Sequence, residues 1–414
     1  SRGFSSRRER SRRTADSFVR CPAHIVCAGL SLCTVEAFAT HASERREVKV
    51  LAAMSGGVDS AVAAALAVEQ GHDVVGVHMA LSKNREQTRN GSRGCCTVED
   101  ASDARRAADH IGIPYYVWDL SNDFHDLVVE DFLSEYSRGR TPNPCVRCNE
   151  RIKFAALMDR ARLLGFDAVC TGHYASIKNE GPKGARSLHR SANMLKDQSY
   201  VLAVMGPEGL ARSVFPLGDF ADKAEVRAEA DRRGLGVGHK PDSYDICFIP
   251  DGDTRGFLER ELGEQPGEIV DTDGRVLGEH SGTYGFTVGQ RKGLNLGRPA
   301  ADGKPRYVLD VKPEARQVVV GAAELLSTRT LIASDVVPFE DLDKGREVEA
   351  QIRAHGEAIA GVITGVEADR EGEGEIASVR VELARPIRGV APGQTLVLYA
   401  GDRVLASATL DARA

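Results

Sequence analysis

One glycine-rich turn limits what this chain can fold into more than any other stretch of its sequence. Residues 54–60 read Met-Ser-Gly-Gly-Val-Asp-Ser, after an apolar run and before small residues with helical spacing. The glycines therefore lie in a turn between a strand and a helix. Because Gly56 and Gly57 lack a Cβ, the backbone can approach an anion, and N–H groups at the helix start point toward negative charge. The sequence predicts a loop that binds phosphate.

The side chains of this loop suit a nucleotide. Asp59 is placed to hold a magnesium ion, and Ser55 and Ser60 to donate hydrogen bonds to phosphate oxygens. It is not a Walker loop, because no Gly-Lys-Ser/Thr follows the glycines. The stretch resembles the SGGxDS loop of the ATP pyrophosphatases, which hold pyrophosphate while AMP is transferred to an oxygen of the substrate. Six matching residues between a strand and a helix disfavour the alternative, a plain glycine-rich turn.

Length, charge and cysteine content narrow the class of protein. At 414 residues the chain is long enough for two or three domains, and no apolar run approaches a membrane span. Its net charge of −6 means that any surface for nucleic acid must be a local patch. Nine irregularly spaced cysteines are too few for a disulfide scaffold, so we expect reduced thiols in a cytoplasmic protein.

Residues 1–47 have no hydrophobic period that predicts a fold, and they begin with a cluster of five arginines between Arg7 and Arg13. The cluster is compatible with an organelle transit peptide, which would make the location organellar. The alternative, which we favour, is a disordered extension or translation begun upstream of the true start. On either interpretation, we expect the ordered core to begin at Val48.

From Val48 the chain alternates between strand and helix patterns, which predicts βαβ units and an open parallel sheet with ligands at the carboxyl ends of its strands. Met79 ends the second strand, where an adenine ring would rest, and Gly172 follows a later strand. The predicted strands are 48–54, 74–79, 115–118 and 168–171, and the predicted helices are 61–70, 99–111, 123–137 and 154–164.

Beyond residue 250 the pattern changes to short β-rich runs separated by glycines. It predicts a small β-rich domain at 250–325 and a closed C-terminal β-barrel at 326–414, after a catalytic domain at 48–249. The expected strands are 267–270, 284–288, 307–311 and 317–320 in the small domain, and 348–354, 358–366, 377–383 and 395–399 in the barrel. A cationic turn at 289–293 suits phosphate contact, although such turns are more often simply exposed.

Two further stretches carry cysteines. Prolines force a rigid loop at 141–149, which presents Cys145 and Cys148 as a CxxC pair. Such a pair is a redox couple, half of a metal site, or without function, and no second CxxC completes a four-cysteine zinc site. Cys247 lies between apolar residues and, taken alone, reads as a buried structural cysteine. A helix is expected from Lys196 to about Met205.

Six stretches together resemble the tRNA-specific 2-thiouridylase family: 55–60, 141–149, 171–174, 196–200, 245–249 and 289–293. The resemblance extends from Val48 to Leu410. Members convert the wobble uridine of certain tRNAs to 2-thiouridine, and they flip the base out of the anticodon loop. The resemblance implies an ATP site at Ala53, Met54, Ser55, Gly56, Gly57, Val58, Asp59, Ser60, Met79 and Gly172. It implies tRNA contacts at Asn143, Pro144, Cys145, His173, Lys196, Asp197, Gln198, Arg353, Ala354 and Gln394.

The resemblance also implies a two-step reaction that uses ATP and Mg²⁺. The 2-oxygen of uridine is first adenylated with release of pyrophosphate, and sulfur then replaces it. Cys247 matches the position that carries a persulfide, and Cys148 matches the nucleophile that resolves the intermediate by forming a disulfide. Sulfur would come from a cysteine desulfurase or a relay protein, and the enzyme would act as a monomer.

Two positions depart from the family pattern. Cys145 stands where many members have Asp, so a proton-transfer role there is in doubt, and an iron–sulfur cluster on Cys145, Cys148 and Cys247 becomes an alternative. We favour the persulfide because a fourth ligand is lacking. Ala354 is smaller than its usual counterpart. Rival functions are another ATP pyrophosphatase ligase, a non-catalytic tRNA-binding protein with structural ATP, and a CxxC redox protein.

Overall fold

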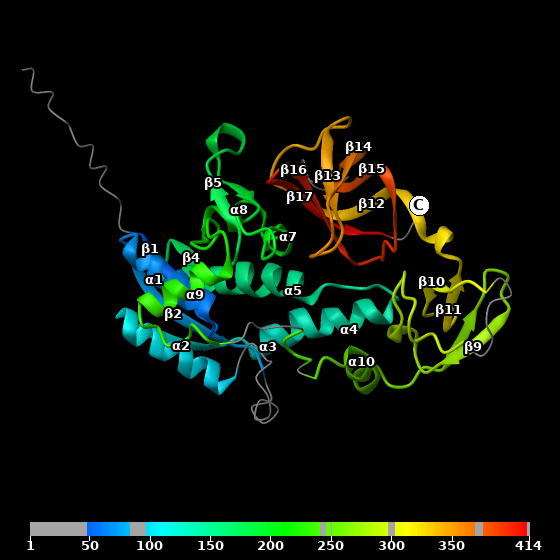
Figure 1. Cartoon of the computed structure of the whole chain (residues 1–414), viewed down its shortest axis with the longest axis horizontal. Coiled ribbons are helices and arrows are strands. Elements are labelled where there is room, and N and C mark those ends of the chain that lie inside the picture. Colours follow the sequence, from blue (N-terminus) through cyan, green and yellow to red (C-terminus); the bar gives the residue numbers. More distant parts are fainter. Residues whose placement is uncertain are drawn as a thin grey trace, which may run out of the picture. The chain divides into compact units, whose positions relative to one another are not determined.

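The computed structural model describes most of the chain from residue 48 to residue 411 (Figure 1). The described ranges are 48–82, 97–240, 246–249, 251–296, 303–368 and 376–411. The predicted leader at 1–47 and Asp245 lie outside them. In these ranges, no helix is both long enough and apolar enough to cross a lipid bilayer.

The N-terminal part is built on a five-stranded sheet in which every pairing is parallel, which confirms the predicted sheet type. The order is β3-β2-β1-β4-β7. Because the chain runs from β1 outward to β2 and β3 and then returns to β4 on the other side of β1, the topological switch point lies between β1 and β4. The strands are β1 Lys49–Ala53, β2 Asp73–Ala80, β3 Tyr115–Asp119, β4 Ala168–Cys170 and β7 Ser213–Val214.

The side chains of the central strand β1 contribute to two hydrophobic cores, one on each face of the sheet. Val50 and Ala52 point into one, which they share with residues of α1 Val58–Glu69, α2 Val98–Ile111 and α9 Lys223–Arg232. Leu51 and Ala53 point into the other, beside α6 Leu157–Leu163. Both faces of the strand are therefore covered, which explains its continuous apolar sequence.

The segment between β3 and β4 is more helical than its sequence predicts. The helix expected at 123–137 is confirmed and runs without a break through α3 Ser121–Phe124, a π-helical turn η1 His125–Val129 and α4 Glu130–Ser137. The helix expected from 154 begins earlier, with α5 Pro144–Arg147 and a π-helical segment η2 Cys148–Ala156. Asn143 caps this start and Pro144 occupies the first helical position, where a missing N–H costs nothing.

Residues 176–211 hold short elements that the sequence analysis missed or extended too far. The helix predicted from Lys196 to about Met205 is instead the short α7 Ser199–Leu202, followed by α8 Gly206–Ala211. Asp197 holds the turn before α7, because its carboxylate accepts from Ser199 N at 3.2 Å and Oγ at 2.7 Å. The earlier elements are β5 Ser176–Lys178, the 3₁₀ turn η3 Pro182–Gly184 and β6 Ser187–His189.

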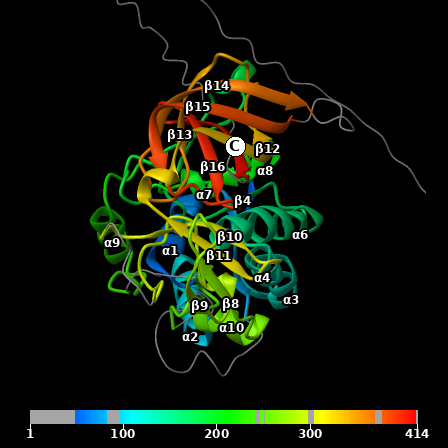
Figure 2. The same cartoon turned by 90° about the vertical axis from the view of Figure 1, so that its right-hand side faces the viewer.

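The middle part contains a four-stranded sheet in the order β10-β11-β8-β9 (Figure 2). The strand expected at 284–288 is wrong. This segment instead contains a 3₁₀ turn, η4 Thr283–Gly285. The alternating apolar residues that suggested a strand are explained by burial of Tyr284 and Phe286 in two separate hydrophobic clusters. The elements are α10 Thr254–Leu262, β8 Gly267–Val270, β9 Val276–His280, β10 Tyr307–Lys312, β11 Gln317–Gly321 and the 3₁₀ turn η5 Ala323–Leu326.

The C-terminal part is a closed β-barrel, as predicted. The order β12-β15-β14-β13-β16-β17 closes through the pairing of β12 with β17, which removes exposed sheet edges. Beyond β17, β6 and β5 extend the sheet through the pairing of Arg403 with His189. The strands are β12 Ser327–Pro338, β13 Glu347–Gln351, β14 Ile359–Ala368, β15 Ile376–Arg388, β16 Thr395–Ala400 and β17 Arg403–Leu410.

Candidate nucleotide and thiol site

The predicted phosphate loop lies at the switch point of the sheet, between the end of β1 and the start of α1. Gly56 has φ +85°, a conformation that side chains rarely adopt, and a Cβ there would overlap the carbonyl oxygen of Asp100. Gly172, which follows β4, packs as closely: its Cβ would lie 2.6 Å from the carbonyl carbon of Asp59. Both glycines are therefore required by close backbone packing around the start of α1.

The two serines of the loop brace each other. The hydroxyl of Ser60 accepts a hydrogen bond from Ser55 N at 3.1 Å and donates one to Gly57 O at 3.0 Å. The two hydroxyl oxygens lie 3.2 Å apart. Gly57 is the N-cap of α1 and offers no side-chain cap, so the first-turn N–H groups are directed at the space that an anion would occupy.

Asp59 is held by two groups from distant parts of the chain. Lys223 Nζ lies 2.6 Å from each of its carboxylate oxygens, and the Tyr174 hydroxyl donates to Oδ1 at 2.7 Å. Lys223 is the first residue of α9, which Asp222 caps. Sequence reasoning missed Lys223. Its only signal was a lysine in a helix first turn, where acidic residues are the usual choice.

Lys240 supports the loop from the other side, and it too was missed. Its ammonium group donates to Gly56 O at 3.1 Å, to Asp100 at 2.5 Å and to Asp103 at 2.7 Å. Burial opposes its charge, but the hydrogen bonds to these two carboxylates outweigh that cost and raise the pKa of Lys240. Lys240 therefore ties the glycine turn to the N-terminus of α2.

The predicted adenine end of the site lies at the carboxyl end of β2. Met79 is partly buried and packs against two apolar clusters, one beneath the sheet and one that contains Cys148. Its neighbour His78 has a pKa lowered by burial, and its Nδ1–H donates to Met54 O at 2.9 Å. This bond fixes the turn between β1 and the glycines.

The structure brings two of the three predicted thiols together. Cys148, buried at the start of η2, belongs to an apolar cluster against which Cys247 packs. Cys145 is exposed, one helical turn earlier, and its N–H donates to Asn143 Oδ1 at 3.1 Å. In the described part of the chain, no three His, Cys, Asp or Glu side chains gather as metal ligands.

Four residues that the sequence analysis assigned to tRNA contact line one pocket. This pocket, of about 390 Å³, is lined by Asn143 from the proline-rich loop, by Arg353 and Ala354 after β13, and by Gln394 before β16. Tyr200, His355 and Gly356 complete its wall. Tyr200 is buried, and its hydroxyl donates to Thr395 O at 2.6 Å, which fixes α7 against the barrel.

The other predicted contact residues lie elsewhere and are largely engaged within the protein. Pro144 is buried. Gln198 Oε1 accepts from Tyr174 N at 2.9 Å, and the Asp197 side chain is only 6% exposed. Lys196 is half-buried in the same turn. The described structure therefore gives Asp197 and Gln198 a role in holding the loop.

His173 is buried directly after Gly172, with its ring near those of Phe154 and Phe215. Burial, reinforced by the charge of Lys153, holds the pKa of His173 well below its usual value, so the ring is neutral near pH 7. Lys153 Nζ can only donate and lies 3.4 Å from His173 Nε2. Nδ1 therefore carries the proton and donates to Thr171 Oγ1 at 2.7 Å.

A parallel sheet with a glycine-rich phosphate loop at its switch point, followed by a β-barrel, defines a nucleotide-binding enzyme with an added β domain. Family models match all three parts: residues 48–251 match the tRNA methyl transferase HUP domain, 255–322 the tRNA methyl transferase PRC-barrel domain, and 328–410 the aminomethyltransferase beta-barrel domain. Individual sequence relatives match nearly the whole described chain at 62% identity. The chain belongs to the tRNA-specific 2-thiouridylase family.

Two relatives illustrate the match. The tRNA-specific 2-thiouridylase MnmA of Beutenbergia cavernae is 62% identical over 366 residues, which cover 88% of this chain and 95% of the relative. That of Kineococcus radiotolerans is 62% identical over 364 residues, covering 88% and 98%. Solved structures are more distant. A 4-thiouridine synthetase in complex with RNA and ATP is 21% identical, with a TM-score of 0.31, over 52% of this chain and 50% of that one.

Proposed function

We propose that this protein is a tRNA-uridine 2-sulfurtransferase that uses ATP to convert the wobble uridine of tRNA to 2-thiouridine. The observation that carries the proposal is the 62% identity to a tRNA-specific 2-thiouridylase across 95% of that relative's length. The packing of Cys247 against the cluster that holds Cys148 supports it, because a carboxyl-adenylating ligase with the same phosphate loop would need neither thiol.

The first half of the reaction is adenylation of the base. The 2-oxygen of uridine attacks the α-phosphorus of ATP, the new O–P bond forms, and the bond to pyrophosphate breaks. The N–H groups at the start of α1 and the hydroxyls of Ser55 and Ser60 hold the phosphates. Met79 and Gly172 bound the nucleoside end at the carboxyl edge of the sheet. The proposed ATP residues are therefore 53–60, Met79 and Gly172.

A magnesium ion fits this site through Asp59. Mg²⁺ is usually held by one or two carboxylates together with substrate phosphates, and Asp59 supplies one carboxylate beside the phosphate cradle. When bound, the ion neutralises phosphate charge during adenylation. Lys223, which pairs with Asp59 in this structure, can then turn its charge toward the phosphates.

The second half replaces oxygen by sulfur. The terminal sulfur of a Cys247 persulfide attacks C2 of the base, and AMP leaves with the former 2-oxygen. The Cys148 thiolate then attacks Cys247 Sγ. This breaks the bond to the transferred sulfur and leaves a Cys148–Cys247 disulfide, which an external thiol reduces. The packing of both thiols in one cluster suits this exchange, since the two sulfurs must meet.

The cluster alternative finds less support. An iron–sulfur cluster held by three thiols needs Cys145, Cys148 and Cys247 to converge, but Cys145 is exposed and Cys148 is buried. In the ranges that the structure describes, these residues do not form a ligand group.

The proposed substrate is tRNA, and the pocket lined by Asn143, Arg353, Ala354 and Gln394 is the proposed surface for the anticodon loop. Hydrogen bonding to an extruded base suits a pocket that presents the amide side chains of Asn143 and Gln394. The sulfur donor is a cysteine desulfurase or relay protein. A monomeric state, a cytoplasmic location and the domain limits at 48–249, 250–325 and 326–414 remain our predictions.

The decisive experiment measures 2-thiouridine in unmodified tRNA incubated anaerobically with ATP, magnesium and a cysteine desulfurase supplied with cysteine, which transfers persulfide sulfur to the protein. Wild type is compared with the variants Cys145→Ala, Cys148→Ala and Cys247→Ala, and iron is assayed in parallel. We expect a colourless, active wild type, an active Cys145→Ala variant, and inactive Cys148→Ala and Cys247→Ala variants. Loss of activity in all three, in step with bound iron, would favour the cluster. No thiolation by wild type would refute the function.

A further inference from the structure

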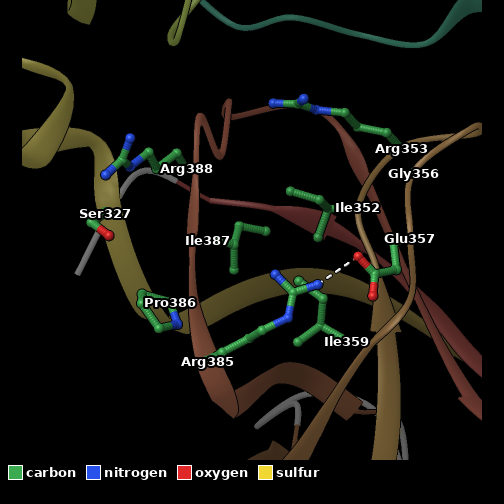
Figure 3. Close-up of a pocket in the computed structure, with 10 residues that line it drawn as sticks. All are labelled: Ser327, Ile352, Arg353, Gly356, Glu357, Ile359, Arg385, Pro386, Ile387 and Arg388. Carbon is green, nitrogen blue, oxygen red and sulfur yellow. Dashed lines mark hydrogen bonds and ion pairs between the residues drawn. The ribbon is translucent and has the colours of Figure 1, made fainter.

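A second pocket opens at one end of the barrel, and apart from Arg353 and Gly356 its residues have no role in the function proposed so far. Its volume is about 440 Å³, and it is lined by the ends of β12 and β15 and by the loop between β13 and β14. Figure 3 shows three arginines, Arg353, Arg385 and Arg388, around the apolar side chains of Ile352 and Ile387. This end of the barrel is therefore apolar at the centre and cationic at the rim.

The charges of the pocket are strongly unbalanced for a chain of net charge −6. Three arginines but a single carboxylate, Glu357, line the pocket, and Glu357 pairs with Arg385 at 2.6 Å (Figure 3). Arg353 donates from Nη2 to Gly389 O at 2.6 Å. The guanidinium of Arg388 has no ion-pair or hydrogen-bond partner among the described residues. The pocket thus presents at least one uncompensated positive charge to an incoming anion.

Arginine clusters of this kind suit one chemical class of ligand. The planar guanidinium donates two parallel hydrogen bonds, a geometry that fits the paired oxygens of a phosphate. The apolar centre formed by Ile352 and Ile387 can cover a ribose or base edge beside that phosphate. A positive patch on an acidic protein is also the expected footprint of a nucleic-acid backbone.

The position of the pocket identifies the source of the phosphate. Arg353 and Gly356 line both this pocket and the neighbouring one that holds Asn143 and Gln394. A nucleotide chain whose target base enters the neighbouring pocket therefore has its adjacent backbone beside Arg353. We propose that the pocket of Arg353, Arg385 and Arg388 binds a backbone phosphate of tRNA next to the target nucleotide. This inference rests on the proposed function.

Glu357 gives the site a built-in counter-charge. Its pairing with Arg385 is exposed, with the two side chains 75% and 53% accessible, so the pair is weak and can open. In the bound state Arg385 can turn from the carboxylate to the phosphate. Removing the carboxylate should then strengthen RNA binding, whereas removing Arg388 should weaken it, and a purely structural role for these residues predicts neither pattern.

The test is equilibrium binding of the full-length protein to unmodified tRNA and to its isolated anticodon stem-loop, measured by fluorescence anisotropy from 50 to 200 mM KCl. We expect Arg388→Ala to weaken binding about threefold to tenfold and to reduce the slope of log affinity against log salt by about 0.7 to 1. Glu357→Gln should strengthen binding about twofold to threefold. Arg380→Ala is the matched control, because Arg380 is exposed on the same strand, β15, outside the pocket.

Each result has a distinct meaning. Wild-type affinity and salt slope for Arg388→Ala would overturn the proposed pocket while leaving the function intact, provided that the wild type binds and thiolates tRNA. A loss seen with whole tRNA but not with the stem-loop would overturn its placement next to the target nucleotide. Inorganic phosphate is the second probe: binding that Arg388→Ala abolishes without changing tRNA affinity would assign the pocket to a free anion. Failure of wild type to bind tRNA would refute the function itself.

Discussion

The ammonium group of Lys223 lies 2.6 Å from both carboxylate oxygens of Asp59, in the first turn of α1, which follows the phosphate loop. The two residues are 164 positions apart, and the pair is mostly shielded, with the Lys223 side chain 16% exposed. A nucleotide bound at this turn brings negative charge to Lys223 and a cation to Asp59. We therefore expect the pair to open when the nucleotide binds.

Replacing Lys223 by Met should impair adenylation more than folding. Loss of a charge that stabilises the departing pyrophosphate should slow tRNA-dependent pyrophosphate release about 100-fold, as for other preorganised electrostatic contacts. Lys223→Arg should keep part of the rate because the charge remains. Pyrophosphate release and thermal unfolding are measured together. The control is Tyr174→Phe, which removes one hydrogen bond to Asp59 and should cost no more than about tenfold. A wild-type rate for Lys223→Met would contradict this role.

Two glycines of left-handed conformation allow a test of the loop packing. At Gly71, with φ +83°, an added Cβ would meet no atom within 4 Å, whereas a Cβ on Gly56 would overlap Asp100 O. Gly71→Ala should therefore cost only about 1 kcal/mol of unfolding free energy from backbone strain. Gly56→Ala adds steric overlap and should cost about 3 kcal/mol, with loss of ATP binding. Urea unfolding and ATP titration compare the two, and equal costs would show that the packing of Gly56 is unimportant.

The sequence predicted the sheet and the barrel because their signals are local. Apolar runs such as 48–54 and alternating runs such as 377–383 contain their own periodicity, and the turn at Gly56 marks where one strand ends. The limits of elements were less predictable. The helix at Pro144 begins ten residues before the predicted one, because proline was interpreted as a break although it stands at the first helical position, where it is favoured.

Contacts between residues far apart in the chain could not be predicted from the sequence. Lys223 and Lys240 contact the phosphate loop from 164 and 184 residues away, and nothing in their own neighbourhoods specifies that contact. The prediction of a strand at 284–288 was wrong for a related reason. Alternation of apolar residues records which side chains are buried, and Tyr284 and Phe286 are buried in different clusters without a strand partner in the described structure.

The buried His173 should make stability depend on pH. Because its folded pKa is lowered well below the unfolded value of 6.5, the unfolded chain binds a proton that the folded chain excludes. Its contribution is therefore complete above pH 6.5 and is lost as the pH falls toward the folded pKa, with a slope of at most about 1.4 kcal/mol per pH unit. His173→Gln should remove this slope. Urea unfolding of both proteins from about pH 5 to 8 checks it, and parallel curves would contradict the assignment.

The thiols should differ sharply in reactivity, and this provides the most direct test of the sulfur-transfer step. Cys170 is a fitting control, because burial raises the pKa of its thiol to about 12 and keeps it protonated. With iodoacetamide at about pH 7.5, the exposed Cys145 should be modified first and Cys170 last.

After a single turnover without reductant, mass spectrometry should find a Cys148–Cys247 disulfide in stoichiometry with 2-thiouridine. Cys145→Ser and Cys170→Ser should retain this product. Cys148→Ser should instead leave the tRNA attached to Cys247 through a disulfide that dithiothreitol releases. If 2-thiouridine forms with no such disulfide, Cys148 does not resolve the intermediate.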